Sequence, residues 1–133
     1  MKGMVLVLAG VAALASLGLI ATADAADAVD AALVATGKAV FQRACAPCHA
    51  AGPGIDGSPM LPGAAALATK HNGAVSPFLE ERGDLTAEVI KVFVRNGSGT
   101  MPMFRKTEIS DAEIVAVAVY LAVVSAAAKS ARH

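Results

Sequence analysis

The sequence predicts an all-α fold of three to five helices, and three observations support this prediction. Two segments in the second half of the chain begin with strong helix N-cap residues. The apolar residues that follow each cap recur at helical spacing. The most strand-prone run, Val92–Val94, lies inside one of these capped segments, so no confident strand is predicted. The 133 residues suffice for one small domain after a short leader.

Residues 1–25 are predicted to be a secretory signal peptide, which leaves a single domain over residues 26–133. Lys2 supplies the charged start, Met4–Ile20 is an apolar run, and small residues with an Ala-x-Ala pattern follow it. An uncleaved membrane anchor is the alternative, because the run is near the lower length limit for spanning a bilayer. We expect a periplasmic domain with no stable membrane insertion after cleavage. The candidate cleavage sites follow Ala23, Ala25 and Ala26.

The mature chain is expected to begin with a helix that runs from Asp30 or Thr36 to Ala46. Residues four positions apart mark one face of this helix. Residues 50–63 contain four glycines and three prolines, so turns and extended segments are expected there. A short helix is predicted over residues 64–70. The face of the first helix is marked by Gly37, Phe41 and Cys45.

Two later helices have clear boundaries. Thr86 is a good N-cap, and Leu85 and Ile90 occupy the positions of a hydrophobic staple around it. This helix is expected to end at residues 95–97, where an asparagine and a glycine suit the left-handed conformation. The last helix is expected to begin at residues 110–113, whose sequence Ser-Asp-Ala-Glu is a capping box.

The pentapeptide Cys-Ala-Pro-Cys-His at residues 45–49 is the attachment motif of a c-type haem. Cys45 and Cys48 would each form a thioether with one haem vinyl group, and His49 would bind the iron as proximal ligand. The motif uses both cysteines of the chain, so one covalently bound haem c is predicted. A thioredoxin-like dithiol would need a βαβ context, and a zinc site would need a second ligand pair. The predicted core is small, so we expect the apoprotein to be poorly folded.

The sixth iron ligand is predicted to be Met101. It follows a glycine-rich loop, which lets the backbone pass close to a flat cofactor, and Pro102 holds it extended. Ligation by histidine and methionine raises the reduction potential and closes the iron to other ligands. Met103 is the alternative ligand or a contact at the haem edge. The remaining candidates, for which core packing or solvated positions are expected, are Met60, His71 and His133.

The chain resembles the class I c-type cytochromes over nearly all of its mature length. Gly37 and Phe41 stand where that family places a glycine and an aromatic residue on its N-terminal helix. Val117 and Tyr120 match the partner positions on the C-terminal helix, where the two helices cross. The resemblance implies a class I cytochrome c fold built around the single haem.

Residues 57–63 also resemble a loop of that family with the pattern Gly-Pro-x-Leu-x-Gly, although Ser58 here separates the glycine from the proline. The resemblance implies that the carbonyl of Pro59 accepts a hydrogen bond from Nδ1 of His49. Such a bond fixes the imidazole tautomer and increases its basicity. The resemblance also implies that Leu61 packs on the haem.

A narrower resemblance, confined to the C-terminal half, is to the cytochrome subunits of p-cresol methylhydroxylase-type flavocytochromes. It implies that a flavoprotein dehydrogenase oxidising 4-alkylphenols donates the electrons, which then pass to a downstream acceptor. Residues 65–84 are expected to carry partner specificity or to form a surface loop only. The resemblance rests on the segments Phe93–Gly97, Met101–Phe104 and Glu108–Ile114.

These features predict an electron-transfer protein and not an enzyme. A general soluble carrier to a terminal oxidase or reductase is the alternative. A peroxidase or a haem sensor needs an open iron site, and the sequence offers no convincing distal His/Arg pair. Eleven basic residues balance eleven acidic ones, so no nucleic-acid partner is expected. Docking is expected at an apolar rim of residues 101–104 and 46–47, with charges at Arg43, Arg105 and Lys106.

Overall fold

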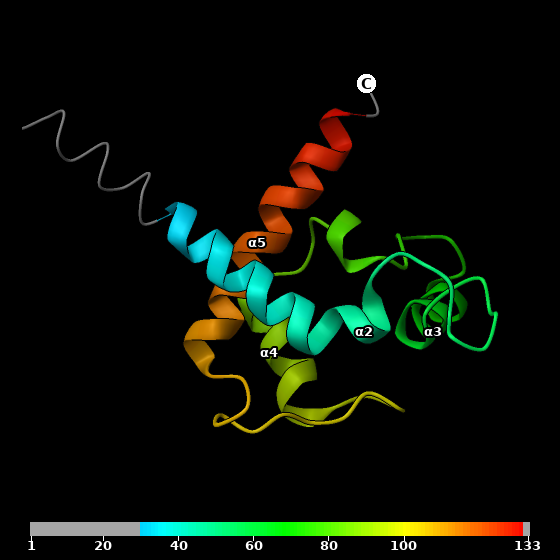
Figure 1. The fold of residues 1–133 in the computed structure, drawn as a ribbon, viewed down its shortest axis with the longest axis horizontal. Helices are drawn as coiled ribbons and strands as arrows, with labels where there is room; N and C mark the ends of the chain where they lie inside the picture. The colour runs from blue at the N-terminus through cyan, green and yellow to red at the C-terminus, as the bar shows by residue number, and fades with distance from the viewer. Residues whose placement is uncertain (1–29, 132–133) are drawn as a thin grey trace, which may run out of the picture. The chain divides into compact units, whose positions relative to one another are not determined.

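A computed structural model of the chain describes residues 30–131, and the predicted signal peptide lies outside these residues. One compact unit begins at Ala32 and includes the rest of the described residues. Helices joined by loops make up its described part (Figure 1). Within that part, β pairing is limited to an isolated bridge between Ser98 and Met101. The predicted all-α fold class is confirmed.

The N-terminal helix extends further than predicted. Residues 30–40 are helical and continue into a π-helical turn, η1 (Phe41–Cys45), and then into the short helix α2 (Ala46–His49). The prediction that this helix ends at Ala46 is wrong. Pro47 lies in the first turn of α2, where a missing N–H leaves no helical hydrogen bond broken, so it does not stop the chain from coiling.

The helix α3 (Pro62–His71) is longer than the predicted 64–70 segment. It begins at Pro62, because the fixed φ of proline suits the first helical position and its missing N–H is not needed there. It ends at Asn72, which adopts the left-handed conformation with φ 46° and ψ 43°. Helix α3 packs against α2 and so against the end of the Cys-x-x-Cys-His segment.

The segment between α3 and α4 is more than a surface loop. Its short 3₁₀-helix η2 (Leu79–Glu81) packs against α5, and Leu79 is in contact with the core. The Tyr120 hydroxyl on α5 donates a hydrogen bond to the carboxylate of Glu80. Burial, together with this carboxylate, raises the pKa of Tyr120 to about 12. No sequence pattern indicates this pair, whose members lie 40 positions apart.

The two helices with clear caps are confirmed. In α4 (Ala87–Asn96), the Thr86 hydroxyl accepts from the Val89 N–H, and Gly97 follows the helix with a φ of 69°. In α5 (Asp111–Ser130), the Ser110 N–H donates to the Glu113 carboxylate at 2.7 Å. The Glu113 N–H in turn donates to the Ser110 hydroxyl at 3.2 Å, which completes the capping box.

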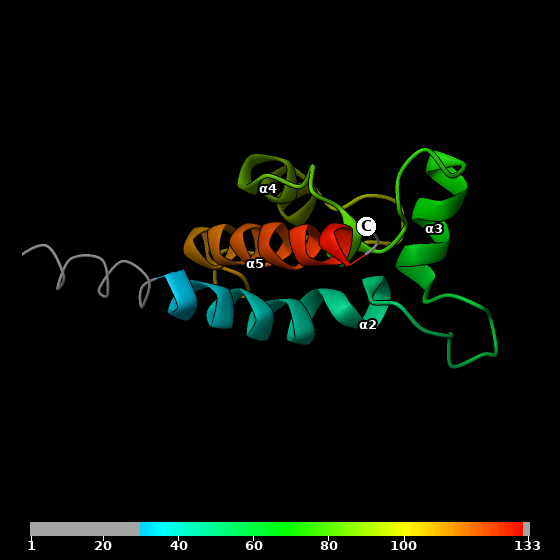
Figure 2. The ribbon, with the colours of Figure 1, turned by 90° about the horizontal axis from the view of Figure 1, so that it is seen from above.

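Helix α5 is the central element of the unit, and Figure 2 shows it between α4 and the N-terminal helix. At its crossing with the N-terminal helix, a Cβ on Gly37 would lie 2.0 Å from the Ala116 carbonyl oxygen and 2.8 Å from the Tyr120 Cβ. The rings of Phe41 and Tyr120 pack with centroids 5.5 Å apart. The buried core consists of Val40, Phe41, Val94, Ile109, Ile114, Val117, Tyr120 and Leu121.

Helix α5 is also the one described helix that is long and apolar enough, by length and composition alone, to cross a membrane. Its most apolar stretch has a mean hydropathy of 1.8. The buried side of this helix supplies half of the core residues, including Ile114 and Leu121, so the apolar composition has a packing role within the fold.

Candidate functional site

The two cysteines lie at the junction of η1 and α2. Cys45 is the last residue of η1 and is partly buried against the core, whereas Cys48 is exposed. Both are free thiols, and burial raises the pKa of the Cys45 thiol to about 11. The π-helical turn immediately before the motif is a type of helical irregularity that often marks functional sites. The thiols are therefore available for covalent attachment of a ligand.

His49, the last residue of α2, is half-buried beneath the start of α3. A Cβ on Gly63 would lie 2.7 Å from Cε1 and 2.9 Å from Nδ1 of the His49 ring, so only glycine fits this contact. Burial lowers the pKa of His49, which favours the neutral imidazole that a metal ion needs. Its Nδ1 atom is buried and has no hydrogen-bond partner in the described part of the chain.

The two other predicted site residues of this region lie just before α3. Pro59 is exposed, and Leu61 is half-buried at the N-cap of α3. The predicted hydrogen bond from His49 Nδ1 to the Pro59 carbonyl is not formed in the structure. Ser58, the residue inserted in the family pattern, donates from its hydroxyl to the Met60 carbonyl at 2.9 Å. This hydrogen bond gives Ser58 a stabilising role in the loop.

Met101 lies in a tight turn that follows α4. The N–H of Met101 donates to the Ser98 carbonyl at 3.0 Å, and the N–H of Ser98 donates to the Met101 carbonyl at 3.1 Å. Gly97 and Gly99 have φ values of 69° and 58°, which favour glycine at both positions. A Cβ on Gly97 would lie 2.7 Å from the Met101 carbonyl oxygen. Gly97 is thus favoured by its positive φ and by the close approach of the backbone, and Gly99 is favoured by its positive φ alone.

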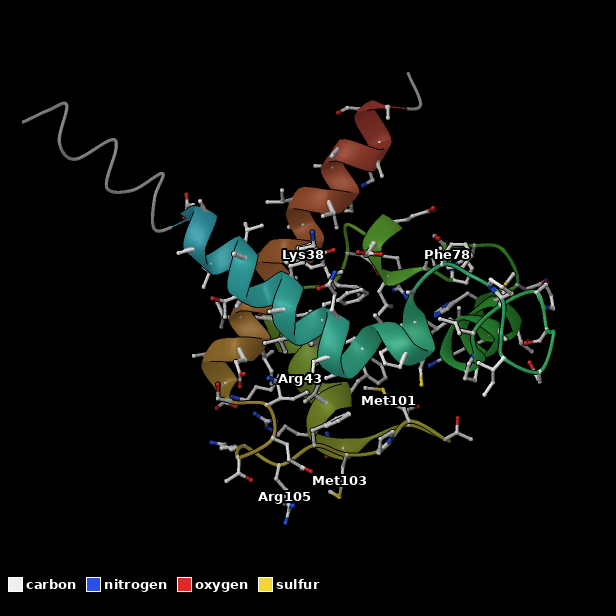
Figure 3. The ribbon with its side chains drawn as sticks, in the orientation of Figure 1. Lys38, Arg43, Phe78, Met101, Met103 and Arg105 are labelled. Atoms are coloured by element: carbon white, nitrogen blue, oxygen red, sulfur yellow. The ribbon has the colours of Figure 1, made fainter. Side chains whose placement is uncertain are left out.

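Met101 and Met103 have different environments. Met101 is half-buried and packs against the core, as do Cys45 and Phe104. Met103 is 65% exposed, and Figure 3 shows its side chain pointing away from the helices. The other candidate ligands are Met60, half-buried in the loop before α3, His71, at the end of α3, and His133, outside the described residues.

Sequence reasoning missed the anchoring role of Arg95 beside this turn. Its guanidinium donates to the carbonyls of Phe104 and Ile109, at 3.0 and 2.8 Å, and to the carboxylate of Asp111 at 2.7 Å. The residue belongs to a segment already quoted for a family resemblance. However, an arginine in the last turn of a helix also interacts favourably with the helix dipole, so its partners could not be inferred.

Positive charge gathers around the Met101 loop, where five cations share three carboxylates. The three predicted rim charges all form ion pairs, with N···O distances of 3.2 to 3.3 Å. Hydrogen bonds from Arg95 and Lys91 hold the pKa of Asp111 well below its usual range. The cations are Arg43, Lys91, Arg95, Arg105 and Lys106, and the carboxylates are Glu108, Asp111 and Glu113.

The described residues fit a covalently bound haem. They provide two free thiols at the attachment spacing, a half-buried neutral imidazole, and a half-buried thioether. The buried Nδ1 atom of His49 still lacks a hydrogen-bond partner, and Gly63 leaves room for the ring. Ala64 of α3 is buried, but α3 contributes no residue to the core cluster that surrounds α5.

Comparison with known proteins gives a consistent result. The family model described as "Cytochrome C oxidase, cbb3-type, subunit III" matches residues 32–121. Cytochrome c6 of Leptolyngbya boryana is 40% identical over 88 residues, which are 65% of this chain and 87% of the relative. Cytochrome c6 of Tetradesmus obliquus is 36% identical over 88 residues, 66% of this chain and 86% of the relative. No solved structure matches the chain significantly.

Proposed function

Since the chain belongs to the class I c-type cytochromes and is an electron-transfer protein with one covalently bound haem c, we propose that His49 and Met101 are the two residues that would hold its iron. The haem supplies the one-electron chemistry between Fe(III) and Fe(II). The chain's own residues attach the haem, exclude other ligands from the iron and set its potential.

The observation that carries this proposal is the environment of Met101. Its backbone is held by two hydrogen bonds to Ser98. Its side chain packs against the same core as Cys45. Met103 is too exposed to share this position. A ligand held in place before it binds loses little conformational entropy on binding, which favours a permanently closed iron.

The other residues have complementary roles in the proposal. Cys45 and Cys48 form the two thioethers, and His49 binds the iron through Nε2. In the haem-bound protein, the Pro59 carbonyl would accept the hydrogen bond from Nδ1 of His49, and Leu61 would cover the porphyrin with apolar surface. The partnerless, buried Nδ1 atom supports this assignment, since a buried N–H costs free energy until it is paired.

The iron ligand is tested by comparing Met101→Ala with Met103→Ala. The absorption band of ferric haem that arises from the iron–sulfur bond should vanish in Met101→Ala, and the reduction potential should fall. Both properties should be nearly unchanged in Met103→Ala. The reverse pattern would identify Met103 as the iron ligand.

We propose that redox partners dock at the rim formed by residues 101–104 and 46–47. Met103, Pro102 and Pro47 are exposed there, and the excess of cations around the loop suits a partner with an acidic surface. The substitutions Met103→Lys and Arg105→Glu should slow electron transfer at low ionic strength. Unchanged rates with every partner would contradict the docking proposal.

The proposed electron donor is a flavoprotein dehydrogenase that oxidises 4-alkylphenols, and the motifs of the C-terminal half support it. Ferric holoprotein is mixed anaerobically with such a flavoprotein and a 4-alkylphenol, and the haem spectrum reports reduction. Rapid reduction that depends on the substrate is expected. No reduction, in a protein that still accepts electrons from a chemical donor, would rule out this donor.

A general carrier to a terminal oxidase is the second candidate, and the matched family favours it, since its description names an oxidase subunit. The two candidates predict different partners for the same closed iron.

We also propose that residues 1–25 are removed on export and that residues 26–133 act in the periplasm. N-terminal sequencing of the exported protein tests this, with a start after Ala23, Ala25 or Ala26 expected.

A further inference from the structure

We infer that Arg95 is a positioning residue that holds the Met101 loop closed against the iron. The inference rests on the proposed ligation by Met101, and it concerns how firmly that ligand is kept in place. Arg95 lies in the last turn of α4, directly before the turn that contains Met101.

The loop between α4 and α5 is tied to Arg95 at two places. Nη1 of Arg95 donates to the Phe104 carbonyl at 3.0 Å, and Nη2 donates to the Ile109 carbonyl at 2.8 Å. The Phe104 N–H donates to the Val94 carbonyl at 2.7 Å, so both backbone groups of Phe104 are bound to the end of α4. Met101 lies in the segment of chain between the residues that these hydrogen bonds join.

A third contact orients the guanidinium. Nη2 also donates to Asp111 Oδ1 at 2.7 Å, and the Arg95 side chain is only 18% exposed. Asp111 is the first residue of α5 and also pairs with Lys91 and Lys106. The planar fork of arginine can reach two carbonyls and a carboxylate at once, whereas the single ammonium of lysine cannot hold the same geometry.

The consequence is a barrier to dissociation of the methionine. To leave the iron, Met101 must move with its loop, and movement of the loop breaks charge-assisted hydrogen bonds that are partly buried. The ion pair of Lys91, also on α4, does not have this effect. Lys91 binds Asp111 from the preceding turn of α4 and donates to no loop carbonyl among the hydrogen bonds of the described residues.

Imidazole competition with the ferric holoprotein tests the inference, because imidazole binds the iron only where Met101 dissociates. Loss of the iron–sulfur band is followed as imidazole is added to wild type, Arg95→Gln, Arg95→Lys and the matched control Lys91→Gln. Arg95→Gln should bind imidazole about tenfold more tightly than wild type, since a charge-assisted hydrogen bond is worth that much or more. The imidazole affinity of Arg95→Lys should lie between those of wild type and Arg95→Gln, and the affinity of Lys91→Gln should equal that of wild type.

Equal imidazole affinity in Arg95→Gln and Lys91→Gln would overturn the inference. If Arg95→Gln does not fold, the comparison of Arg95→Lys with Lys91→Gln decides, and equal affinities again overturn it. Urea unfolding of each variant separates this effect from a general loss of stability, which does not by itself release the methionine. Met101→Ala distinguishes the two proposals: if that variant keeps the iron–sulfur band, the ligand assignment fails and not merely the role of Arg95.

Discussion

Gly37 sets the distance between the N-terminal helix and α5. Its Cα lies so close to the Ala116 carbonyl that an added Cβ would be 2.0 Å from the oxygen. The neighbour is helix backbone, which cannot rotate away as a side chain can. The sequence resemblance identified this position, and the structure supplies the physical reason for the glycine.

We predict that Gly37→Ala destabilises the ferric holoprotein by about 3 kcal/mol, because the two helices must separate at a packed crossing. Urea unfolding followed by circular dichroism measures the change. Gly83→Ala is the matched control, since the added Cβ there meets the mobile end of Lys129 at 2.8 Å. Similar losses in both variants would show that the crossing is not tightly packed.

The Asp111 carboxylate contributes to the pH dependence of the free energy of unfolding. Hydrogen bonds from Arg95, Lys91 and Lys106 lower its pKa in the folded protein, whereas the unfolded value is about 3.9. The folded state therefore binds this proton less readily than the unfolded state. The stabilisation is present above about pH 4 and is lost as the pH falls through the lower folded pKa.

We predict that Asp111→Asn flattens the acid limb of the stability profile between about pH 2 and 4. Part of the slope should remain, because hydrogen bonds with Ser110 and with Arg105 also lower the pKa values of Glu113 and Glu108. Urea unfolding at a series of pH values gives the profile. An acid limb identical to that of wild type would contradict the assigned role of Asp111.

At the scale of elements, the two capped helices differ in the quality of their caps. Ser110 and Glu113 satisfy each other's backbone N–H groups, with bonds of 2.7 and 3.2 Å. The Thr86 cap consists of one bond of 3.4 Å to the Val89 N–H. The start of α5 also fixes the end of the Met101 loop, so its cap matters for the site.

We predict that Ser110→Ala costs about 1 to 2 kcal/mol of unfolding free energy and that Thr86→Ala costs about 0.5 kcal/mol. The difference follows from the reciprocal bonds at Ser110 and the long single bond at Thr86. Urea unfolding of the two variants provides the comparison. A larger loss in Thr86→Ala would reverse the proposed order of the caps.

The sequence predicts elements well where the determinants are local. The caps at Thr86 and Ser110, the glycine end of α4 and the haem-attachment motif each depend on a few adjacent residues. Contacts between distant residues could not be predicted, such as the Glu80–Tyr120 pair and the links from Arg95 to Phe104 and Ile109. The early start of α3 was missed because the glycines and prolines of residues 50–63 favour a loop.

For the whole unit, the core and the haem site stabilise different parts of the chain. The residues of the core cluster come from the N-terminal helix, α4, α5 and Ile109, and the buried Ala64 of α3 lies outside this cluster. Helix α3 packs instead on α2, and Lys70 of α3 lies 5.7 Å from the centre of the Phe93 ring of α4. A covalently held porphyrin between these parts would supply apolar contacts that the small core lacks.

We predict that the double variant Cys45→Ala/Cys48→Ala, purified without haem, loses protection against hydrogen exchange first in residues 50–71. Amides of α5, including that of Leu121, should retain more protection, because α5 lies in the core. Hydrogen exchange measured by mass spectrometry on the haem-free and haem-bound proteins compares the two regions. Equal protection of residues 50–71 in both forms would show that the haem is not needed to order them.

Electron transfer by this cytochrome is proposed to pass through an iron closed by His49 and Met101. Exposure of the ferrous holoprotein to carbon monoxide tests it most directly, because carbon monoxide binds ferrous haem only at an open position. The haem spectrum of wild type should not change, and Met101→Ala should bind carbon monoxide rapidly. Rapid binding by wild type would contradict the claim and would indicate an open iron suited to catalysis or sensing.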